Sequence, residues 1–178
     1  MFIGLQQLEL RPVQFDVEIP AGQIDYDGKL GQASILFAKG SAQLLNHSLG
    51  EIRVQGKLKV IVHGTCDRCL EPATFPIESR FDLVYMPASE SAGAENEVDE
   101  AGIEVGYYEG SGLALEDILR EVVLLALPMQ LVCTDTCKGI CPVCGQNRNQ
   151  RDCGCHSEAV DDRWSKLKTL RAEIGPHN

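Results

Sequence analysis

Six of the eight cysteines of this chain lie within the stretch from Cys133 to Cys155. Inside it, Cys141-Pro-Val-Cys144-Gly145 has the form of a metal-binding knuckle. Two thiolates separated by two residues can chelate one ion, and the glycine lets backbone amides turn toward the sulfur atoms. Structural zinc sites take four such ligands, commonly all cysteine. A segment this short cannot hold itself together by hydrophobic contacts, so we expect bound metal to order it.

A second cysteine pair is expected at the tip of a β-hairpin. Between Glu51 and His63, apolar and polar residues alternate with the period of a half-buried antiparallel strand, and the residues from Ile77 to Tyr85 alternate again. Cys66 and Cys69 lie between these two strands, where the chain must turn. Gly56 interrupts the first strand, which predicts a bulge or a tight bend. Shorter strand patterns occupy residues 14–19, 33–38, 42–45 and 103–107.

Eight cysteines suit two sites of four thiolates each. One arrangement places one ion between Cys141, Cys144, Cys153 and Cys155, and a second ion between Cys66, Cys69, Cys133 and Cys137. The second set would tie the hairpin tip to the chain that follows a long helix. The predicted cofactor is one or two Zn²⁺ ions, with iron left open.

Other ligand sets remain open at this point. The spacing Cys153-x-Cys155 departs from the usual two residues, and Cys133, Cys137 and Cys141 recur every four residues, as a helical chelating set would. His63 and His156 flank the cysteines and could substitute as ligands. Disulfides are the remaining alternative, but a reducing compartment disfavours them.

One main helix is predicted over residues 113–127. Ser111 is the expected N-cap, and Pro128 should end the helix. Its apolar face comprises Leu115, Ile118, Leu119, Val122, Leu125 and Ala126. A second helix is predicted over residues 161–174, with Trp164 on its apolar side. The segment 88–102 contains acidic residues and no Lys or Arg, which predicts a solvated loop.

These patterns predict an α+β fold: an antiparallel β-sheet or small partly open barrel with one main packing helix. The β-rich body would occupy residues 1–132, with the acidic loop 88–102 and the helix 113–127. Residues 133–178 would form a small cysteine-rich metal-binding segment followed by the C-terminal helix.

The charge limits the classes of partner. A formal net charge of −10 argues against a chain that grips nucleic acid over its whole surface. Residues 133–178 contain seven basic and six acidic residues, so any RNA contact is first sought there. The N-terminus lacks the basic and apolar regions of a signal peptide, and no apolar run reaches the roughly 20 residues of a membrane helix. We therefore expect a cytoplasmic protein with no membrane partner and no small-molecule substrate.

The order of these motifs resembles the YceD family of large ribosomal RNA subunit accumulation proteins. The resemblance rests on Cys66-Asp-Arg-Cys69-Leu-Glu after an alternating strand, an acidic loop, a helix ending in Leu127-Pro128, and the stretch Cys137-Lys-Gly-Ile-Cys141-Pro-Val-Cys144-Gly145. Gln146-Asn147-Arg148-Asn149 is similar, with one change, to an asparagine-containing stretch of the family. The resemblance implies a ribosome-biogenesis factor that supports accumulation or processing of 23S-type ribosomal RNA, with the large-subunit precursor as partner. It supplies no catalytic residues.

Two functions of other classes compete with this interpretation. A rubredoxin-like electron carrier would bind iron with two Cys-x-x-Cys-Gly loops, but Leu70 stands where the second glycine should be. A thiol redox enzyme would place its cysteine pair before a helix, whereas Cys66 and Cys69 precede a strand. Four-thiolate zinc sites have no open coordination position for catalysis, and the four histidines show no catalytic pattern. We therefore expect no enzymatic activity.

Overall fold

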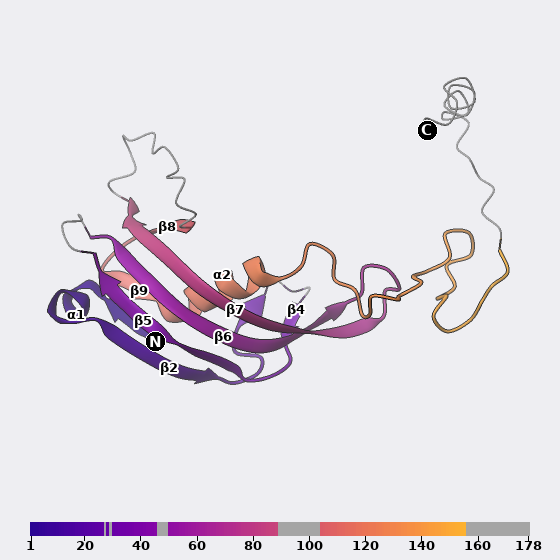
Figure 1. The fold of residues 1–178 in the computed structure, drawn as a ribbon, viewed down its shortest axis with the longest axis horizontal. Helices are drawn as coiled ribbons and strands as arrows, with labels where there is room; N and C mark the ends of the chain where they lie inside the picture. Colours follow the sequence, from indigo (N-terminus) through magenta and orange to yellow (C-terminus); the bar gives the residue numbers. More distant parts are fainter. Residues whose placement is uncertain (27, 29, 46–49, 89–103, 156–178) are drawn as a thin grey trace, which may run out of the picture.

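A long, curved β-sheet forms the body of the protein, and the cysteine-rich segment extends beyond one end of it (Figure 1). The computed structural model describes residues 1–26, 28, 30–45, 50–88 and 104–155. Its elements are β1 (Phe2–Gly4), α1 (Leu5–Leu10), β2 (Val13–Ile19), β3 (Asp25–Tyr26), β4 (Leu30–Gln32), β5 (Leu36–Leu44), β6 (Ile52–Thr65), β7 (Pro72–Pro87), β8 (Glu104–Tyr108), β9 (Gly112–Ala114) and α2 (Leu115–Ala126).

The main sheet is open and almost entirely antiparallel. Strand β6 is its centre, because it pairs with β5 and β4 along one edge and with β7 along the other. Strand β2 extends the sheet beyond β5, β3 extends it beyond β4, and β8 pairs with β7 in parallel. The predicted α+β fold with a mostly antiparallel sheet and one main helix is confirmed, and the sheet does not close into a barrel.

The predicted hairpin forms the longest ladder among the described strands. Strands β6 and β7 stay in register from Ile52 opposite Tyr85 to Thr65 opposite Pro72, and the turn between them holds Cys66 and Cys69. The alternation read from the sequence is the observed burial pattern. On one face the side chains are buried, namely those of Ile52, Val54, Leu58, Val60, Val62, Phe75, Ile77, Phe81, Leu83 and Tyr85.

Gly56 does not mark a bulge, because the ladders on both of its sides continue through it in register. It lies between Gly40 and Phe81 in one row across the sheet, and Phe15 ends that row beyond Gly40. A Cβ atom on Gly56 would lie 2.7 Å from the carbonyl oxygen of Lys39 and 2.7 Å from Cζ of Phe81. The glycine therefore leaves room for an aromatic ring from the neighbouring strand to cover the backbone.

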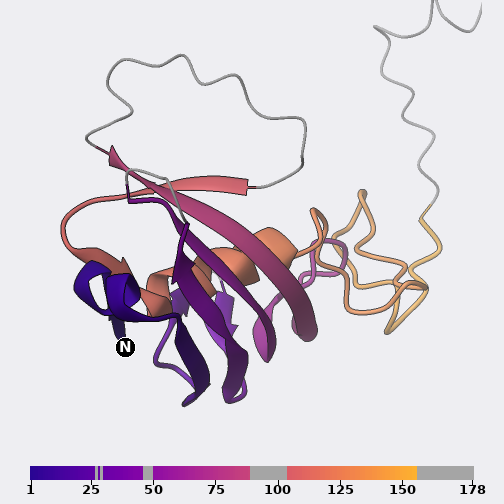
Figure 2. The same cartoon turned by 60° about the vertical axis from the view of Figure 1, so that its left-hand side comes forward.

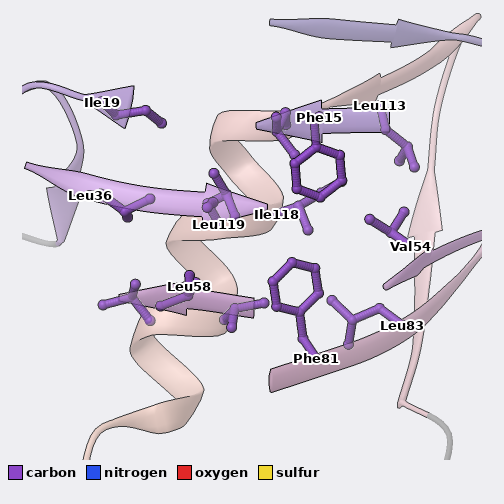
Figure 3. Packing of buried hydrophobic residues seen from close by; sticks show 14 of the residues in the cluster. Phe15, Ile19, Leu36, Val54, Leu58, Phe81, Leu83, Leu113, Ile118 and Leu119 are labelled. Carbon is purple, nitrogen blue, oxygen red and sulfur yellow. The ribbon is translucent and has the colours of Figure 1, made fainter. Parts of the chain in front are cut away.

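Helix α2 packs across the inner face of the sheet and completes the core (Figure 2). Ile118 and Leu119 point from the helix toward side chains of the strands, including Leu58 and Phe81 (Figure 3). The helix is also tied at its polar edge, where the Tyr85 hydroxyl donates to Glu121 over 2.9 Å and Nε of Arg120 donates to the Asp25 carbonyl over 2.7 Å.

The predicted start of this helix was wrong. The helix begins at Leu115, its N-cap is Ala114 without a side-chain cap, and Ser111 lies outside it. The preceding residues form β9, which pairs with β1, and the Ser111 carbonyl accepts a hydrogen bond from the Leu5 amide. Pairing with the N-terminal strand therefore competes successfully with helix formation. On the apolar face Leu125 is 61% exposed, and Val123 is buried instead.

Several sequence predictions fall outside the described residues. They are the second helix over 161–174, His156, and all of the acidic loop except Ala88. Within the described residues, no helix is both long enough and apolar enough to span a membrane.

We predict that Gly56→Ala destabilises the sheet by about 1–3 kcal/mol, because the new methyl group has no space between the Lys39 carbonyl and the Phe81 ring. The free energy of unfolding in urea measures this. Gln55→Ala is the matched control, since Gln55 lies next in the same strand on the opposite face, and we expect a change within about 0.5 kcal/mol. Equal losses in the two variants would contradict this account of Gly56.

Candidate metal centres

The eight cysteine sulfur atoms gather into two groups of four. Within each group all four sulfur atoms lie within 4.8 Å of one another. One group is Cys66, Cys69, Cys133 and Cys137, and the other is Cys141, Cys144, Cys153 and Cys155. The structure thus brings together the residues of the two-ion arrangement. It separates Cys141 from Cys133 and Cys137, so the alternative set with helical spacing does not form.

The first group, which we call centre 1, joins the hairpin tip to the chain after α2. The sulfur atoms of Cys66 and Cys137 lie 3.9 Å apart, and those of Cys69 and Cys133 lie 3.8 Å apart. A zinc ion with Zn–S bonds of about 2.3 Å holds neighbouring sulfur atoms about 3.8 Å apart, whereas a disulfide needs about 2.05 Å. The spacing therefore suits four ligands around an ion.

The second group, which we call centre 2, is built around the Cys141 knuckle and is more open. Cys141 is buried, Cys153 is half-buried, and Cys144 and Cys155 are exposed. The short spacing of Cys153 and Cys155 is accommodated by Gly154, whose φ of 64° lies in the left-handed region. Reversal of the chain at this glycine brings both sulfur atoms to the same group.

The two Cys-x-x-Cys loops share one backbone geometry. In centre 1 the Leu70 amide donates to the Cys66 carbonyl over 2.9 Å, and in centre 2 the Gly145 amide donates to the Cys141 carbonyl over 2.8 Å. The residue after the second cysteine has positive φ in both loops, 61° for Leu70 and 73° for Gly145. Leu70 thus adopts the conformation that glycine adopts in the other knuckle, so the missing glycine does not prevent the knuckle from forming.

The first cysteine thiol of each loop has a pKa below its ordinary value. Backbone amides of Cys144 and Val143 point at the Cys141 sulfur and lower the pKa of this thiol to about 6. Burial opposes ionisation of Cys66, yet the amides of Cys69, Cys133 and Arg68 outweigh it and lower its pKa to about 6. Thiolate is the form that binds a metal. A side-chain hydrogen bond from Asn149 likewise lowers the pKa of Cys137.

The hairpin tip is fixed against the chain after α2 by hydrogen bonds from both residues between its cysteines. The backbone amide of Asp67 donates to the Leu131 carbonyl over 2.7 Å, and its carboxylate accepts from the Leu131 amide over 2.6 Å. The carbonyl of Arg68 accepts from the Ile140 amide over 2.9 Å. These bonds position the segment that brings Cys133 and Cys137 to the hairpin.

Two asparagines connect the two centres. The Asn147 side chain is 9% exposed and donates to Glu71 over 3.2 Å, beside centre 1, while its oxygen accepts from the Asn149 amide over 2.9 Å. The Asn149 side chain donates to the Cys137 sulfur over 3.2 Å. From the sequence, this stretch was identified only by its similarity to the family, and no role was predicted for it. The sequence shows only that two asparagines follow the knuckle closely, and nothing in it indicates their partners.

Histidine is not a ligand of either group in the part of the chain that the structure describes. His63 lies on the exposed face of β6, where its ring covers Gly31 of the neighbouring strand.

We predict that Asn147→Ala loosens centre 2 relative to centre 1. The substitution leaves Glu71 and the Asn149 amide without this partner, at a cost of about 1–2 kcal/mol. That loss corresponds to about tenfold faster amide exchange in the peptide 138–150, measured by hydrogen–deuterium exchange. Arg148→Ala is the matched control, because Arg148 is exposed and neighbours Asn147. Unchanged exchange in Asn147→Ala would show that the asparagine does not couple the centres.

Comparison with known proteins identifies a family that shares the cysteine-containing part of the chain. The family model described as "Large ribosomal RNA subunit accumulation protein YceD" matches residues 54–171, which include the β6–β7 hairpin except its first two residues, and all eight cysteines. No solved structure matches the chain.

The chain has a low sequence identity to its curated relatives, but the similarity extends over about 70% of its length. The chain is 28% identical over 127 residues to an uncharacterized protein of Mycobacterium tuberculosis, covering 71% of this chain and 58% of that protein. It is 24% identical over 149 residues to the "Large ribosomal RNA subunit accumulation protein YCED homolog 1, chloroplastic" of Arabidopsis thaliana, covering 70% of this chain and 46% of that protein. The chain thus spans about half the length of these relatives. Because the family model matches more than half of the chain, the protein belongs to the YceD family.

Proposed function

We propose that this protein is a ribosome-biogenesis factor that supports the accumulation or processing of 23S-type large-subunit ribosomal RNA. The observation that carries the proposal is the family match over residues 54–171. The Arabidopsis relative, which carries the same description, supports it. The partner is the large-subunit precursor, through its RNA or its proteins. We place the protein in the cytoplasm, the compartment in which a bacterial ribosome is assembled.

We further propose that each cysteine group binds one Zn²⁺ ion with a structural role. Support comes from the sulfur spacing and from the amides that stabilise thiolate at Cys66 and Cys141. Four thiolates fill the tetrahedral coordination of zinc and leave no position for water or substrate. The metal would therefore stabilise the fold, and we propose that the protein acts without catalysis.

The part of the chain that carries the cysteines has only a small apolar core of its own. The buried cluster at the hairpin tip consists of Cys66, Cys69 and Cys137, with Ala73 and Val132 packed against it. Apolar burial on this scale contributes only a few kcal/mol, about 0.8 kcal/mol for each buried CH₂ group. Binding of zinc to a structural site is worth about 10–16 kcal/mol, so metal would dominate the stability of this segment.

We predict about two zinc ions per chain by elemental analysis of the purified protein, and about one in Cys141→Ser. Hydrogen exchange should rise throughout residues 138–155 of this variant, while β6 and β7 stay protected, because the sheet has its own core. Val143→Ser is the matched control, since Val143 lies in the same knuckle and is 59% exposed. A red, iron-containing protein would instead support the rubredoxin-like alternative, and a metal-free protein with an ordered segment would overturn the metal proposal.

We predict that depletion of the protein in its host lowers the ratio of large-subunit to small-subunit ribosomal RNA, measured on total RNA. Expression of the wild-type chain should restore the ratio. Cys66→Ser should restore it poorly if centre 1 is needed to hold the hairpin tip, whereas Val143→Ser should restore it fully. A depleted strain with a normal ratio would refute the proposed function, whatever the metal content of the protein.

A further inference from the structure

On the three long strands β5, β6 and β7, the outer face of the sheet is more basic than expected for so acidic a protein, whereas the neighbouring strand β2 adds Asp16 and Glu18 to this face. The two described helices pack on the inner face, since Leu8 of α1 and Leu119 of α2 belong to the same buried core. The outer face of β5, β6 and β7 is exposed in the described part of the chain (Figure 2). On these three strands it displays five of the sixteen basic residues of the chain and two acidic residues. The basic residues are Lys39, Arg53, Lys57, Lys59 and Arg80, and the acidic ones are Glu78 and Asp82.

Three of these cations form a row across adjacent strands. Lys57 of β6 lies directly opposite Lys39 of β5 on one side and opposite Arg80 of β7 on the other. All three side chains are exposed. Like charges in directly opposite positions of a sheet repel each other. The register of the sheet therefore places three cations next to one another, which is electrostatically unfavourable.

Most of the ion pairs that the structure describes on this face involve the cations next to the row, and only one cation of the row itself is paired. Lys39 binds Asp16 over 2.7 Å at the outer end of the row. In the next rows Arg53 binds Asp82 over 2.6 Å and Lys59 lies 3.7 Å from Glu78. Among the described residues, Lys57 and Arg80 have no ion pair or side-chain hydrogen bond. Two adjacent cations thus remain available for an anionic ligand.

An exposed apolar strip lies beside the cations on the same face. Phe37 of β5 is 48% exposed and stands two residues from Lys39, on the same side of the strand. Ile61 of β6 is 40% exposed and Ile35, directly before β5, is 43% exposed. The face therefore offers a flat aromatic ring next to a row of cations.

We propose that this outer face binds single-stranded RNA, with backbone phosphates on Lys57 and Arg80 and a base stacked on Phe37. The proposal rests on the proposed function and names a contact surface for it. Proteins bind single strands by combining a cationic track for the backbone with aromatic rings on which bases stack. An acidic protein partner would also bind the cations, but its binding would not require the Phe37 ring.

This surface replaces the C-terminal segment as the first place to look for an RNA contact. The formal charge of +1 for residues 133–178 counts the cysteines as neutral. With four thiolates around one divalent ion, each centre has a net charge of about −2. Metal loading would therefore make the cysteine-rich segment repel phosphate, while the charge of the sheet face is unchanged.

The test is binding of the full zinc-loaded chain to a fluorescein-labelled, mixed-sequence single-stranded RNA of about 20 nucleotides, followed by anisotropy at several salt concentrations. We expect the double variant Lys57→Gln/Arg80→Gln to bind at least about tenfold more weakly and to lower the slope of log K against log salt by about 1.4. Phe37→Ala should weaken binding about tenfold without changing the slope, because stacking releases no counterions.

Two controls make the outcome decisive. Arg148→Gln/Arg151→Gln removes two exposed cations from the cysteine-rich segment and should leave affinity within about twofold. The melting temperature of Lys57→Gln/Arg80→Gln should equal or exceed that of the wild type, because the substitution relieves repulsion. Wild-type affinity in this double variant, loss of binding in the Arg148 and Arg151 variant, or equal affinity of the wild type for polyglutamate would each overturn the inference. The ribosomal RNA ratio of the depleted strain is independent of these results and tests the proposed function separately.

Discussion

The register of the β6–β7 ladder determines where Lys57, Arg80 and the first cysteine pair lie. Fourteen consecutive pairs fix which side chains face the core and which face solvent, and a slip by one residue would exchange the two sets. The ladder also carries the chain well past the core, so that Cys66 and Cys69 project beyond the end of the sheet (Figure 1). The centre of the core, two of the three cations of the row and the first cysteine pair therefore depend on one set of backbone hydrogen bonds, and the β5–β6 ladder adds Lys39.

The sequence predicted features with a local signal and missed those that depend on distant partners. Alternation between Glu51 and Tyr85 was enough to place the hairpin and its cysteine tip, since the period of two is a property of the strand itself. Nothing local indicates that residues 112–114 pair with the N-terminal strand, so Leu113 and Ala114 were assigned to the helix. Gly56 was similarly misread as a bulge, because the ring that covers it comes from Phe81, 25 positions away in the sequence.

At the cysteine groups, residue type was predictable and the supporting contacts were not. Cysteine spacing alone suggested the two sets, because chelation restricts which thiols can share an ion. The polar residues that orient the loops, Asp67, Asn147 and Asn149, are ordinary surface types whose partners only the fold supplies. Leu70 is instructive in the same way. A leucine at positive φ costs about 1–2 kcal/mol, and the adjoining ladder and the Asp67–Leu131 bonds provide more than enough stabilisation to hold it there.

The two sides of the sheet are subject to different physical constraints. The inner face must exclude water, and there the sequence tolerates little besides apolar side chains. The outer face is free to vary at a cost of about 0.2–1 kcal/mol for each unfavourable pair. Lys57 and Arg80 incur that cost, and among the described residues they have no ion pair to offset it. An arrangement that weakens the free protein and is exposed to solvent is better explained by a ligand that is absent from the isolated chain. Phosphate is the ligand that would turn the mutual repulsion of these cations into binding energy.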